Sequence, residues 1–528
     1  MKGGWWKAAA LVVGFTVLLL LTSFSLAAMS AAAPGAAAGL STFTSSTSAT
    51  VVDGAFSKAT PISSGFWGIN VEPDQPFTSK DAAAVAATPA TYIRFPGGSL
   101  GDELNYTSGV YTTVTGTQKK VTTSTAEFVT ECKAIGCHSI MQLPGEIDNP
   151  AVAAYYVSYV VHTLGYQPAY WEIGNAPSGW THFGIPWSQW GSKTGPAVTP
   201  ETFANMVHAY IAAVLKADSS AKFLALGAGM GTADYSKTWV EELVAVDGKE
   251  ISGISVHSYI LATSPSHPTD ADLFANLGGA YSLPDQIGAV RSYIQATCST
   301  CNIGVFVSEI NAAEAGSTYV PLMSGFAGTL YIAAEITQGL SLQVPNMDWF
   351  CYHCDYLGAW SIHTLSFQKQ YYLFSDLATQ LKTETLPATV TGPSTFYAVP
   401  TYNSGGLSLL MVNVGSTSVS ANIAQTGFVL DKSGVTEYSW VNGASLPSKS
   451  SVTLSSTITV PAMSIILLTA AASGTKSPSG ASDTAGPTLI GGTAAPTIGA
   501  IPHLAGSVLP AARGPQLVPS VFTMSRPL

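Results

Sequence analysis

Between residues 62 and 385, eight short apolar runs alternate with longer helical patterns, and this alternation constrains the fold more than any other feature of the sequence. The apolar runs cover residues 65–71, 91–95, 139–143, 170–174, 222–226, 254–257, 303–308 and 347–351. Most are continuous, which is typical of strands buried on both faces. Helical patterns lie between them, for example at residues 125–135, 151–163, 201–217, 283–296 and 320–340. This alternation predicts an α/β fold, a parallel (β/α)₈ TIM barrel over residues 62–385.

A second pattern begins at residue 386. Short runs at 407–414, 418–423, 435–440, 453–460 and 463–468 are separated by Gly, Asn, Ser and Pro. This pattern predicts a C-terminal antiparallel β-sandwich over residues 386–471. Residues 49–61 contain a strand-like run that we expect to join this sandwich. Residues 472–528 are rich in Pro, Gly, Ala, Ser and Thr without periodicity, which indicates a disordered tail.

The first 33 residues have the layout of a signal peptide. Two lysines lie within residues 1–7, an uncharged and mainly apolar run covers 8–28, and three alanines follow at 31–33. The apolar run is also long enough to serve as an uncleaved membrane anchor. In both cases, a linker at 34–48 follows and the rest of the chain is expected to be extracellular, secreted or held at the cell surface.

Charge and cysteine content narrow the classes of partner. The net charge is −10 and no cluster of Lys or Arg occurs, which argues against a nucleic-acid partner. Six cysteines form three close pairs, Cys132/Cys137, Cys298/Cys301 and Cys351/Cys354, which in an exported chain indicates local disulfides. A zinc site built from the two C-x-x-C pairs is the alternative, but the pairs lie too far apart for a compact zinc ribbon. We expect no metal and no cofactor.

The C-terminal ends of the predicted barrel strands contain the candidates for chemistry, because catalytic groups lie there in this fold. Their polar and aromatic residues are Arg94, Asp102, Asn105, Gln142, Glu146, Glu172, Asn175, His257, Tyr259, Glu309, Asn311, Tyr352 and His353. Arginine, amide, carboxylate and aromatic groups together suit a polar ring that needs hydrogen bonds and stacking. The sequence therefore predicts a sugar site and a carbohydrate partner. Trp171 and Trp180 suit either core packing or a sugar platform.

Four motifs make the sugar prediction more specific. They are Y-W-E-I-G-N at 170–175 followed by Pro177, S-E-I-N at 308–311, I-R-F-P-G-G at 93–98 followed by Asp102, and V-P-A-M-S at 460–464. Each resembles a motif of the heparanase and β-glucuronidase family of glycoside hydrolases, family 79. The resemblance spans roughly residues 50–470, and the motifs occur in the family's order.

The resemblance implies a retaining glycoside hydrolase that acts on β-linked uronic acids. It implies Glu309 as the nucleophile, Asn175 as the amide that contacts the sugar 2-hydroxyl, and His257 and Tyr259 as positioning groups. It also implies that Arg94, Gly98, Asp102 and Asn311 contribute to substrate binding. From the residues alone, Arg94 can also join the barrel rim by bonding Glu309, and His257 can be an ordinary buried histidine.

One position departs from the family pattern. The general acid/base glutamate of the family follows the strand-four asparagine, and here Ala176 occupies that place. Losing a general acid typically costs roughly 10²–10⁴ in rate. Glu146 or Asp148, from a neighbouring loop, could replace it.

Three functions therefore stay open. The first is an active hydrolase with a relocated acid or with a substrate that needs none. The second is a pseudoenzyme that binds carbohydrate at the cell surface, and the third is a structural surface protein without a sugar pocket. An altered residue at position 176 would also explain the alanine.

Overall fold

The computed structural model describes residues 47–471 except 54–57, 89, 230–236, 262–267, 280–281, 313–319, 354–359, 362–365, 368, 426–432 and 442. The predicted signal peptide, nearly all of the linker and the tail lie outside these residues. Within them, no helix is both long and apolar enough to cross a membrane.

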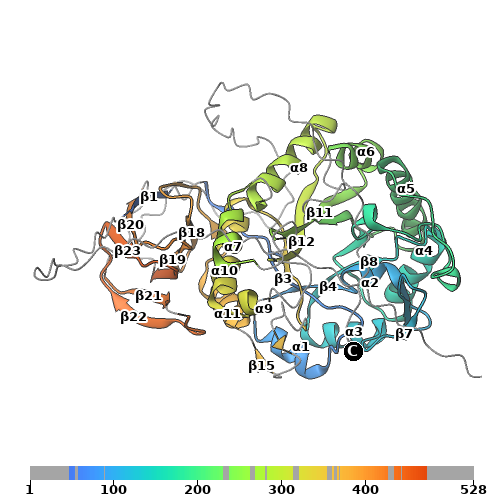
Figure 1. Cartoon of the computed structure of the whole chain (residues 1–528), viewed down its shortest axis with the longest axis horizontal. Helices are drawn as coiled ribbons and strands as arrows, with labels where there is room; N and C mark the ends of the chain where they lie inside the picture. Colours follow the sequence, from blue (N-terminus) through green and yellow to red (C-terminus); the bar gives the residue numbers. More distant parts are fainter. Residues whose placement is uncertain are drawn as a thin grey trace, which may run out of the picture. The chain divides into compact units, whose positions relative to one another are not determined.

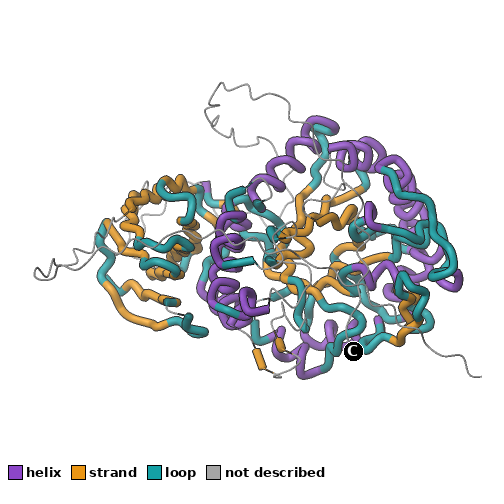
Figure 2. The backbone as a smooth tube through the Cα atoms, viewed as in Figure 1, coloured by secondary structure: helices purple, strands orange, loops and turns teal. Residues whose placement is uncertain are grey.

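Eight parallel strands form a closed barrel, which confirms the predicted fold class (Figures 1 and 2). The barrel strands are β3 (Trp67–Asn70), β4 (Tyr92–Phe95), β8 (His138–Leu143), β9 (Tyr170–Ile173), β10 (Phe223–Gly229), β11 (Ile251–Tyr259), β12 (Gly304–Asn311) and β13 (Met347–Trp349). They pair in chain order, and β13 closes the barrel against β3. Because all eight run the same way, their C-terminal ends meet at one mouth.

Helices surround the barrel strands (Figure 2). They are α1 (Ser79–Ala86), α3 (Thr125–Ile135), α4 (Pro150–Ser158), α5 (Pro200–Ala217), α6 (Lys237–Asp247), α7 (Asp270–Asn276), α8 (Leu283–Thr297), α9 (Val320–Ser324), α10 (Phe326–Ser341) and α11 (Lys369–Gln380). Local signals explain their bounds. Ser124 and Glu127 form a capping box at the start of α3, and Gly136 ends it in the left-handed conformation. The helix expected over 320–340 is divided, because Gly325 is extended between α9 and α10.

The loop after β4 contains its own small structure. A short helix, α2 (Ser99–Glu103), is followed by a three-stranded sheet of β5 (Leu104–Asn105), β6 (Val110–Thr112) and β7 (Gln118–Lys120). A hairpin of β14 (Trp360–Ser361) and β15 (Ser366–Phe367) lies in the segment after β13. Short turns of helix occur at Tyr159–Thr163, Pro177–Gly179 and Trp187–Gln189.

The β domain consists of two sheets. One has the strand order β17-β1-β20-β23 and the other β2-β16-β18-β19-β24-β21-β22. The strands are β1 (Thr47–Asp53), β2 (Thr60–Pro61), β16 (Glu384–Thr385), β17 (Ala388–Thr391), β18 (Phe396–Asn403), β19 (Gly406–Asn413), β20 (Val419–Gln425), β21 (Val435–Trp440), β22 (Ser448–Val452), β23 (Thr457–Val460) and β24 (Ser464–Ala471). Their pairings are antiparallel except that β1 runs parallel to β20.

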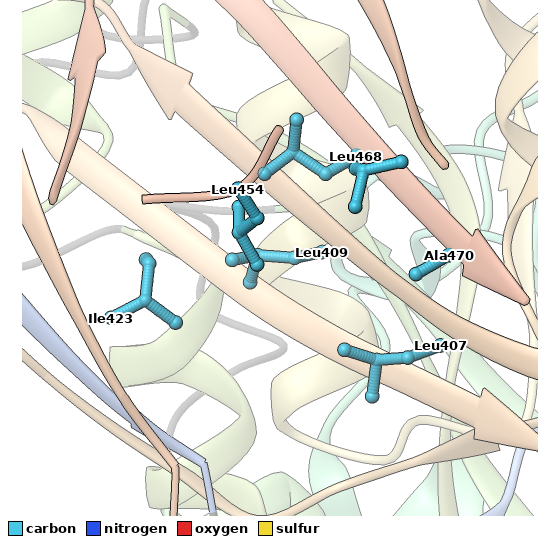
Figure 3. Close-up of a pocket in the computed structure, with 7 residues that line it drawn as sticks. Leu407, Leu409, Ile423, Leu454, Leu468 and Ala470 are labelled. Atoms are coloured by element: carbon cyan, nitrogen blue, oxygen red, sulfur yellow. The ribbon is translucent and has the colours of Figure 1, made fainter. Parts of the chain in front are cut away.

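The two faces of the larger sheet pack on different partners. Leu410 and Leu467 join the large core that contains α10 residues such as Leu330. Aliphatic side chains on the other face, including Leu409 and Leu468, join the core between the two sheets. A small apolar pocket remains there, and Figure 3 shows the side chains that line it.

Two of the three cysteine pairs form disulfides within the described residues, Cys132–Cys137 and Cys298–Cys301. Each closes a short turn, at the end of α3 and directly after α8. The second bridge makes Cys298 and Cys301 unavailable as zinc ligands, so the alternative zinc site loses half of its donors. Cys354 of the third pair lies outside the described residues.

Candidate active site at the barrel mouth

Arg94 lies at the centre of the polar cluster inside the barrel mouth. It is the third residue of β4 and is completely buried. Its Nε donates to Glu172. Its Nη1 donates to Asn70 (3.1 Å) and Glu309 (2.6 Å). Its Nη2 donates to Gln142 (3.4 Å) and Asn175 (3.0 Å). Burial alone would lower the pKa of Arg94, but Glu172 and Glu309 outweigh it and raise that pKa. The guanidinium is therefore a permanent cation that joins the ends of five strands.

Glu309 is held from both sides of its carboxylate. Its Oε1 accepts from Arg94, and its Oε2 accepts from the Tyr259 hydroxyl at 2.5 Å. Tyr259 reaches it because β11 and β12 are adjacent and parallel. Burial raises the pKa of Glu309, and Arg94 and Tyr259 reduce that rise without cancelling it. The side chain is thus fixed in one position, with a carboxyl that ionises at a higher pH than an exposed glutamate.

His257 lies against the same carboxylate. Its Nδ1 is 3.4 Å from Glu309 Oε2, and the side chain is nearly buried. Burial lowers the pKa of His257 well below its ordinary value, and the charge of Arg94 lowers it further. The imidazole is therefore neutral at physiological pH, so this close contact is not an ion pair.

Two further carboxyl groups lie deeper in the barrel, Glu172 and Asp348, and both are fully buried. Glu172 is paired with Arg94. Asp348 accepts from the Asn346 amide at 2.9 Å. Burial raises the pKa of Asp348 well above its ordinary value, and Glu172 and Glu309 add to this rise, whereas the Asn346 amide and Arg94 oppose it. The ion pairs of Arg94 are formed with Glu172 and Glu309.

Asn175 and Ala176 follow the end of β9. The Asn175 side-chain oxygen accepts from Arg94, which in turn donates to Glu309. Ala176 is half-buried and lies in the left-handed region with φ 48°, and its backbone N–H donates to Gly227 at 2.7 Å. Arg94 thus connects the predicted nucleophile to Asn175, the residue directly before the predicted acid position.

Two other predicted substrate-binding residues have mainly structural contacts. Asp102 is buried, and accepts from the Gly145 backbone and from the Trp180 indole N–H at 3.1 Å. Asn311 is fully buried and bonds backbone groups of Phe350 and Ala312. Both side chains hold strand ends and loops together.

Gly98 has a different role, because its φ of 78° favours glycine. A β-carbon there would lie 3.4 Å from Glu72 and 3.6 Å from the Phe350 ring. These are ordinary contact distances, so the backbone conformation and not a lack of space favours glycine at this position.

The two predicted substitute acids differ in environment. Glu146 is nearly buried, and its Oε1 accepts from the backbone N–H groups of Thr181 (2.8 Å) and His182 (2.6 Å). Asp148 is exposed, in the left-handed region with φ 45°. Burial raises the pKa of both carboxyl groups. Oε1 of Glu146 therefore holds the loop after β9 in place, and this oxygen is engaged by the backbone instead of facing a ligand.

Trp171 and Trp180 are both buried by packing within the protein. Trp171 is completely buried in the main core, so packing explains it. Trp180 is also nearly buried, and its indole N–H lies between Asp102 and the backbone oxygen of Asn175. Its ring fits against Gly145, where a β-carbon would be 2.4 Å away. Neither ring forms an open platform for a sugar.

Sequence reasoning missed two residues of this cluster. Asn70 bonds Arg94, as the strand-end candidate Gln142 also does, and Glu72 lies directly beyond β3 beside Gly98. A signal was present, because Asn70 and Glu72 occur at or just after the end of a predicted strand. The described residues contain no group of three or more His, Cys, Asp or Glu side chains that could hold a metal ion. The apolar pocket of the β domain is lined by aliphatic side chains alone and does not suit a sugar.

No family model and no curated protein matches the chain. Solved structures do match. The GH51 arabinofuranosidase from Xanthomonas axonopodis pv. citri has a TM-score of 0.65 at 16% identity, over 80% of this chain and 100% of that one. CelM2, a bifunctional glucanase-xylanase from a metagenome library, has a TM-score of 0.62 at 13% identity, over 81% and 99%. A GH44 xyloglucanase from Paenibacillus polymyxa has a TM-score of 0.61 at 11% identity, over 81% and 100%. At these identities the likeness shows the fold, so the chain has the barrel and β-sandwich architecture of these glycoside hydrolases.

Proposed function

We propose that the barrel mouth is the active site of a retaining glycoside hydrolase with Glu309 as the nucleophile. The observation that carries this proposal is the clamp on Glu309, in which Arg94 holds one carboxylate oxygen and Tyr259 holds the other. A nucleophilic carboxylate must be fixed within a few tenths of an ångström and be ionised when substrate arrives. Both partners favour the ionised form, because one is a cation and the other donates a hydrogen bond.

In this proposal, the Glu309 carboxylate attacks the anomeric carbon as the bond from that carbon to the leaving oxygen breaks, and the leaving group departs. Water then hydrolyses the resulting glycosyl ester and releases the sugar and Glu309. Neutral His257 and the Asn175 amide orient the sugar. The names of the structural neighbours support a carbohydrate partner, because an arabinofuranosidase, a glucanase-xylanase and a xyloglucanase all act on glycosides. The sequence motifs add the resemblance to enzymes that cleave β-linked uronic acids.

Ala176 sets the limit on this activity. Alanine can neither protonate the leaving oxygen nor activate water, so alkyl glycosides should react slowly. Glycosides whose leaving group is a stable anion need little protonation, so they should still form the ester. A second candidate function follows from the same residue, namely a carbohydrate-binding pseudoenzyme that keeps the pocket without turnover.

Replacing Ala176 by an acid tests the proposal. Ala176→Glu should raise the rate on alkyl glycosides by roughly 10²–10⁴, because it supplies the absent proton donor. Ala176→Gln is the matched control, since it has the same length and no acid. Initial rates of sugar release from alkyl and dinitrophenyl glycosides would be measured for the three proteins.

The outcomes separate the candidates. A gain specific to glutamate and to alkyl glycosides supports the hydrolase scaffold. Wild-type protein as fast as Ala176→Glu would contradict the pseudoenzyme candidate, and a glutamate variant no faster than the glutamine variant would contradict the assigned acid position.

A further inference from the structure

The peptide unit between Asn175 and Ala176 is held at both of its ends. Its carbonyl oxygen, that of Asn175, accepts from the Trp180 indole N–H at 3.0 Å. Its N–H, that of Ala176, donates to the backbone oxygen of Gly227 at 2.7 Å. Because a peptide unit is planar, hydrogen bonds at its two ends leave it little freedom to rotate. The plane of this peptide is therefore fixed by two separate parts of the chain.

This peptide joins two residues on which the proposed reaction depends. The Asn175 side-chain oxygen accepts from Arg94 at 3.0 Å, and Arg94 also bonds the predicted nucleophile, Glu309. Position 176 is the predicted acid position. Since the two residues share one peptide, a rotation of its plane would turn the Asn175 amide and the side chain at position 176 together.

Trp180 holds the carbonyl end and is itself firmly placed. Its indole N–H also faces Asp102 Oδ2 at 3.1 Å, and Asp102 Oδ1 accepts from the Gly145 backbone at 3.0 Å. The rings of Phe183 and Phe203 pack against the indole. The direction of the indole N–H is therefore set by contacts within the protein.

A β-bulge in β10 holds the N–H end. Leu226 and Gly227 of β10 lie opposite the single residue Ser255 of β11, which is the two-against-one arrangement of a bulge. Both bulge residues have a positive φ, 93° for Leu226 and 49° for Gly227. Leucine rarely adopts such a conformation, so it persists only where neighbouring contacts hold the backbone.

Ser255 supplies these contacts. Its side chain is completely buried, and its hydroxyl accepts from the Gly227 N–H at 3.0 Å and donates to the Ala225 oxygen at 3.2 Å. The bulge then lies directly against the turn after β9. A β-carbon at Gly227 would be 2.7 Å from the Gly174 oxygen and 3.3 Å from the Asn175 Cα. A side chain at this position would therefore push the bulge and the turn apart.

We propose that Trp180 and Ser255 are positioning residues for the reaction at the barrel mouth. Trp180 acts directly on the carbonyl end of the peptide between Asn175 and Ala176, and Ser255 acts on its N–H end through the bulge. Together they set the direction of the Asn175 amide and of the side chain at position 176. Their part in the reaction rests on the proposed function, whereas the fixed peptide plane does not.

The acid position provides a functional readout. Trp180→Phe removes the indole N–H and Ser255→Ala removes the hydroxyl, and each would be combined with Ala176→Glu and, separately, with Ala176→Gln. In each background, the rate of the glutamate chain on an alkyl glycoside is divided by the rate of the glutamine chain, so a general loss of folded protein cancels. A misdirected acid loses its advantage, so this ratio should fall about 10- to 100-fold from its value with Trp180 and Ser255 intact.

Two buried residues of the same types serve as controls. Trp190→Phe removes an indole N–H that donates to the Ile185 oxygen at 2.8 Å in the same loop as Trp180. Ser139→Ala removes a fully buried hydroxyl from the second position of β8, away from the mouth. Both variants should leave the ratio unchanged.

Hydrogen–deuterium exchange tests the fixed peptide without any substrate. In chains that keep Ala176, its amide should exchange about tenfold or more faster in Trp180→Phe and in Ser255→Ala than in the wild type, because release of the peptide breaks its bond to Gly227. Residue 177 is a proline without an amide, so a proteolytic fragment that ends there carries the Ala176 amide as its last one. The two control variants should exchange like the wild type.

The possible outcomes are distinguishable. A ratio or an exchange rate that both variants leave unchanged would overturn the inference. Ser255→Ala removes a single oxygen, so it decides alone if Trp180→Phe does not fold. If Ala176→Glu is no faster than Ala176→Gln even with Trp180 and Ser255 intact, the proposed acid position fails, and the exchange rate then decides whether these two residues hold the peptide.

Discussion

Arg94 shows how one buried cation can organise a site. It draws groups from β3, β4, β8, β9 and β12 into a single network, and removing one partner would leave a buried charge without compensation. Such losses typically cost ~3–5 kcal/mol, so Arg94 variants are expected to lose folding as well as function. Substitutions that test chemistry are better made at the periphery of the network, where Tyr259 is the clearest choice.

Tyr259→Phe should shift the pH dependence of the reaction. The hydroxyl lowers the pKa of Glu309 against the effect of burial, so its loss should raise that pKa further. Because the nucleophile acts as the carboxylate, the acid limb of the kcat/KM profile should move to higher pH. At pH 6, kcat/KM on a dinitrophenyl glycoside should fall roughly 10- to 100-fold.

The exposed Tyr155 on α4 provides the control, because Tyr155→Phe removes the same hydroxyl far from the network. An acid limb that stays in place in the Tyr259 variant would show that this hydrogen bond does not tune Glu309.

At the scale of elements, α10 is the most unusual helix of the barrel. Its residues 327–340 are all buried, including Glu335, whose two carboxyl oxygens have no hydrogen-bond partner among the described residues. Burial raises the pKa of Glu335 to about 8. The helix packs between the barrel and the β domain, and Tyr397 of β18 interacts electrostatically with this carboxyl.

Glu335 should make stability depend on pH. Its pKa in the folded chain lies above its ordinary value of 4.5, so the folded chain keeps a proton that the unfolded chain releases. The favourable contribution is complete below about pH 4.5 and is lost as the pH rises through about 8. Glu335→Gln should therefore raise Tm at pH 8.5 by several degrees, about 1–3 kcal/mol of unfolding free energy, and change it little at pH 4.5.

Thermal unfolding at the two pH values checks this prediction, with Glu201→Gln on the exposed surface of α5 as the control. An equal shift at both pH values would mean that packing, rather than the proton, explains the effect.

At the scale of the whole molecule, the first and last described strands, β1 and β24, both belong to the β domain. β1 lies between β17 and β20, so residues that precede the barrel complete a sheet of the β domain. Ala49 and Val51 are buried in the core of that domain. The β domain is therefore built from two segments of the chain, one before and one after the barrel. Removing the first segment would open this sheet.

Truncation should expose this dependence. A chain that starts at residue 58 lacks β1 and should unfold at a clearly lower temperature, or aggregate through the two unpaired strands. A chain that starts at residue 47 keeps β1 and is the control. Equal thermal unfolding of the two chains would show that β1 contributes little to the β domain.

Much of the barrel could be predicted from the sequence, because its strands are continuous apolar runs that local patterns reveal. Every one of the eight predicted runs overlaps an observed barrel strand. The β domain was harder. β18 (Phe396–Asn403) was missed because Pro400 lies within it, and proline is uncommon inside a paired strand. The parallel pairing of β1 with β20 joins residues far apart in sequence, which no local pattern reveals.

The candidate site, like the fold, could be predicted from the sequence only in part. Strand position alone brings Arg94, Asn175 and Glu309 together, because parallel strands end at one mouth. The bonds that Asp102, Glu146 and Asn311 make to neighbouring loops and strand ends depend on how the chain folds there, so the sequence did not reveal their supporting contacts. The raised pKa of Asp348 and the five hydrogen bonds of Arg94 likewise follow only from burial and distance.

Covalent trapping tests the central claim about Glu309 most directly. The wild-type chain would be incubated with dinitrophenyl 2-deoxy-2-fluoro glycosides, both neutral and uronic, and analysed by intact mass and peptide mapping. A good leaving group drives ester formation without an acid, while the fluorine and Ala176 both slow hydrolysis, so the ester should accumulate. The account predicts a mass increase of one glycosyl unit located on Glu309. A label on another residue, or no label from any glycoside that the protein binds, would contradict it.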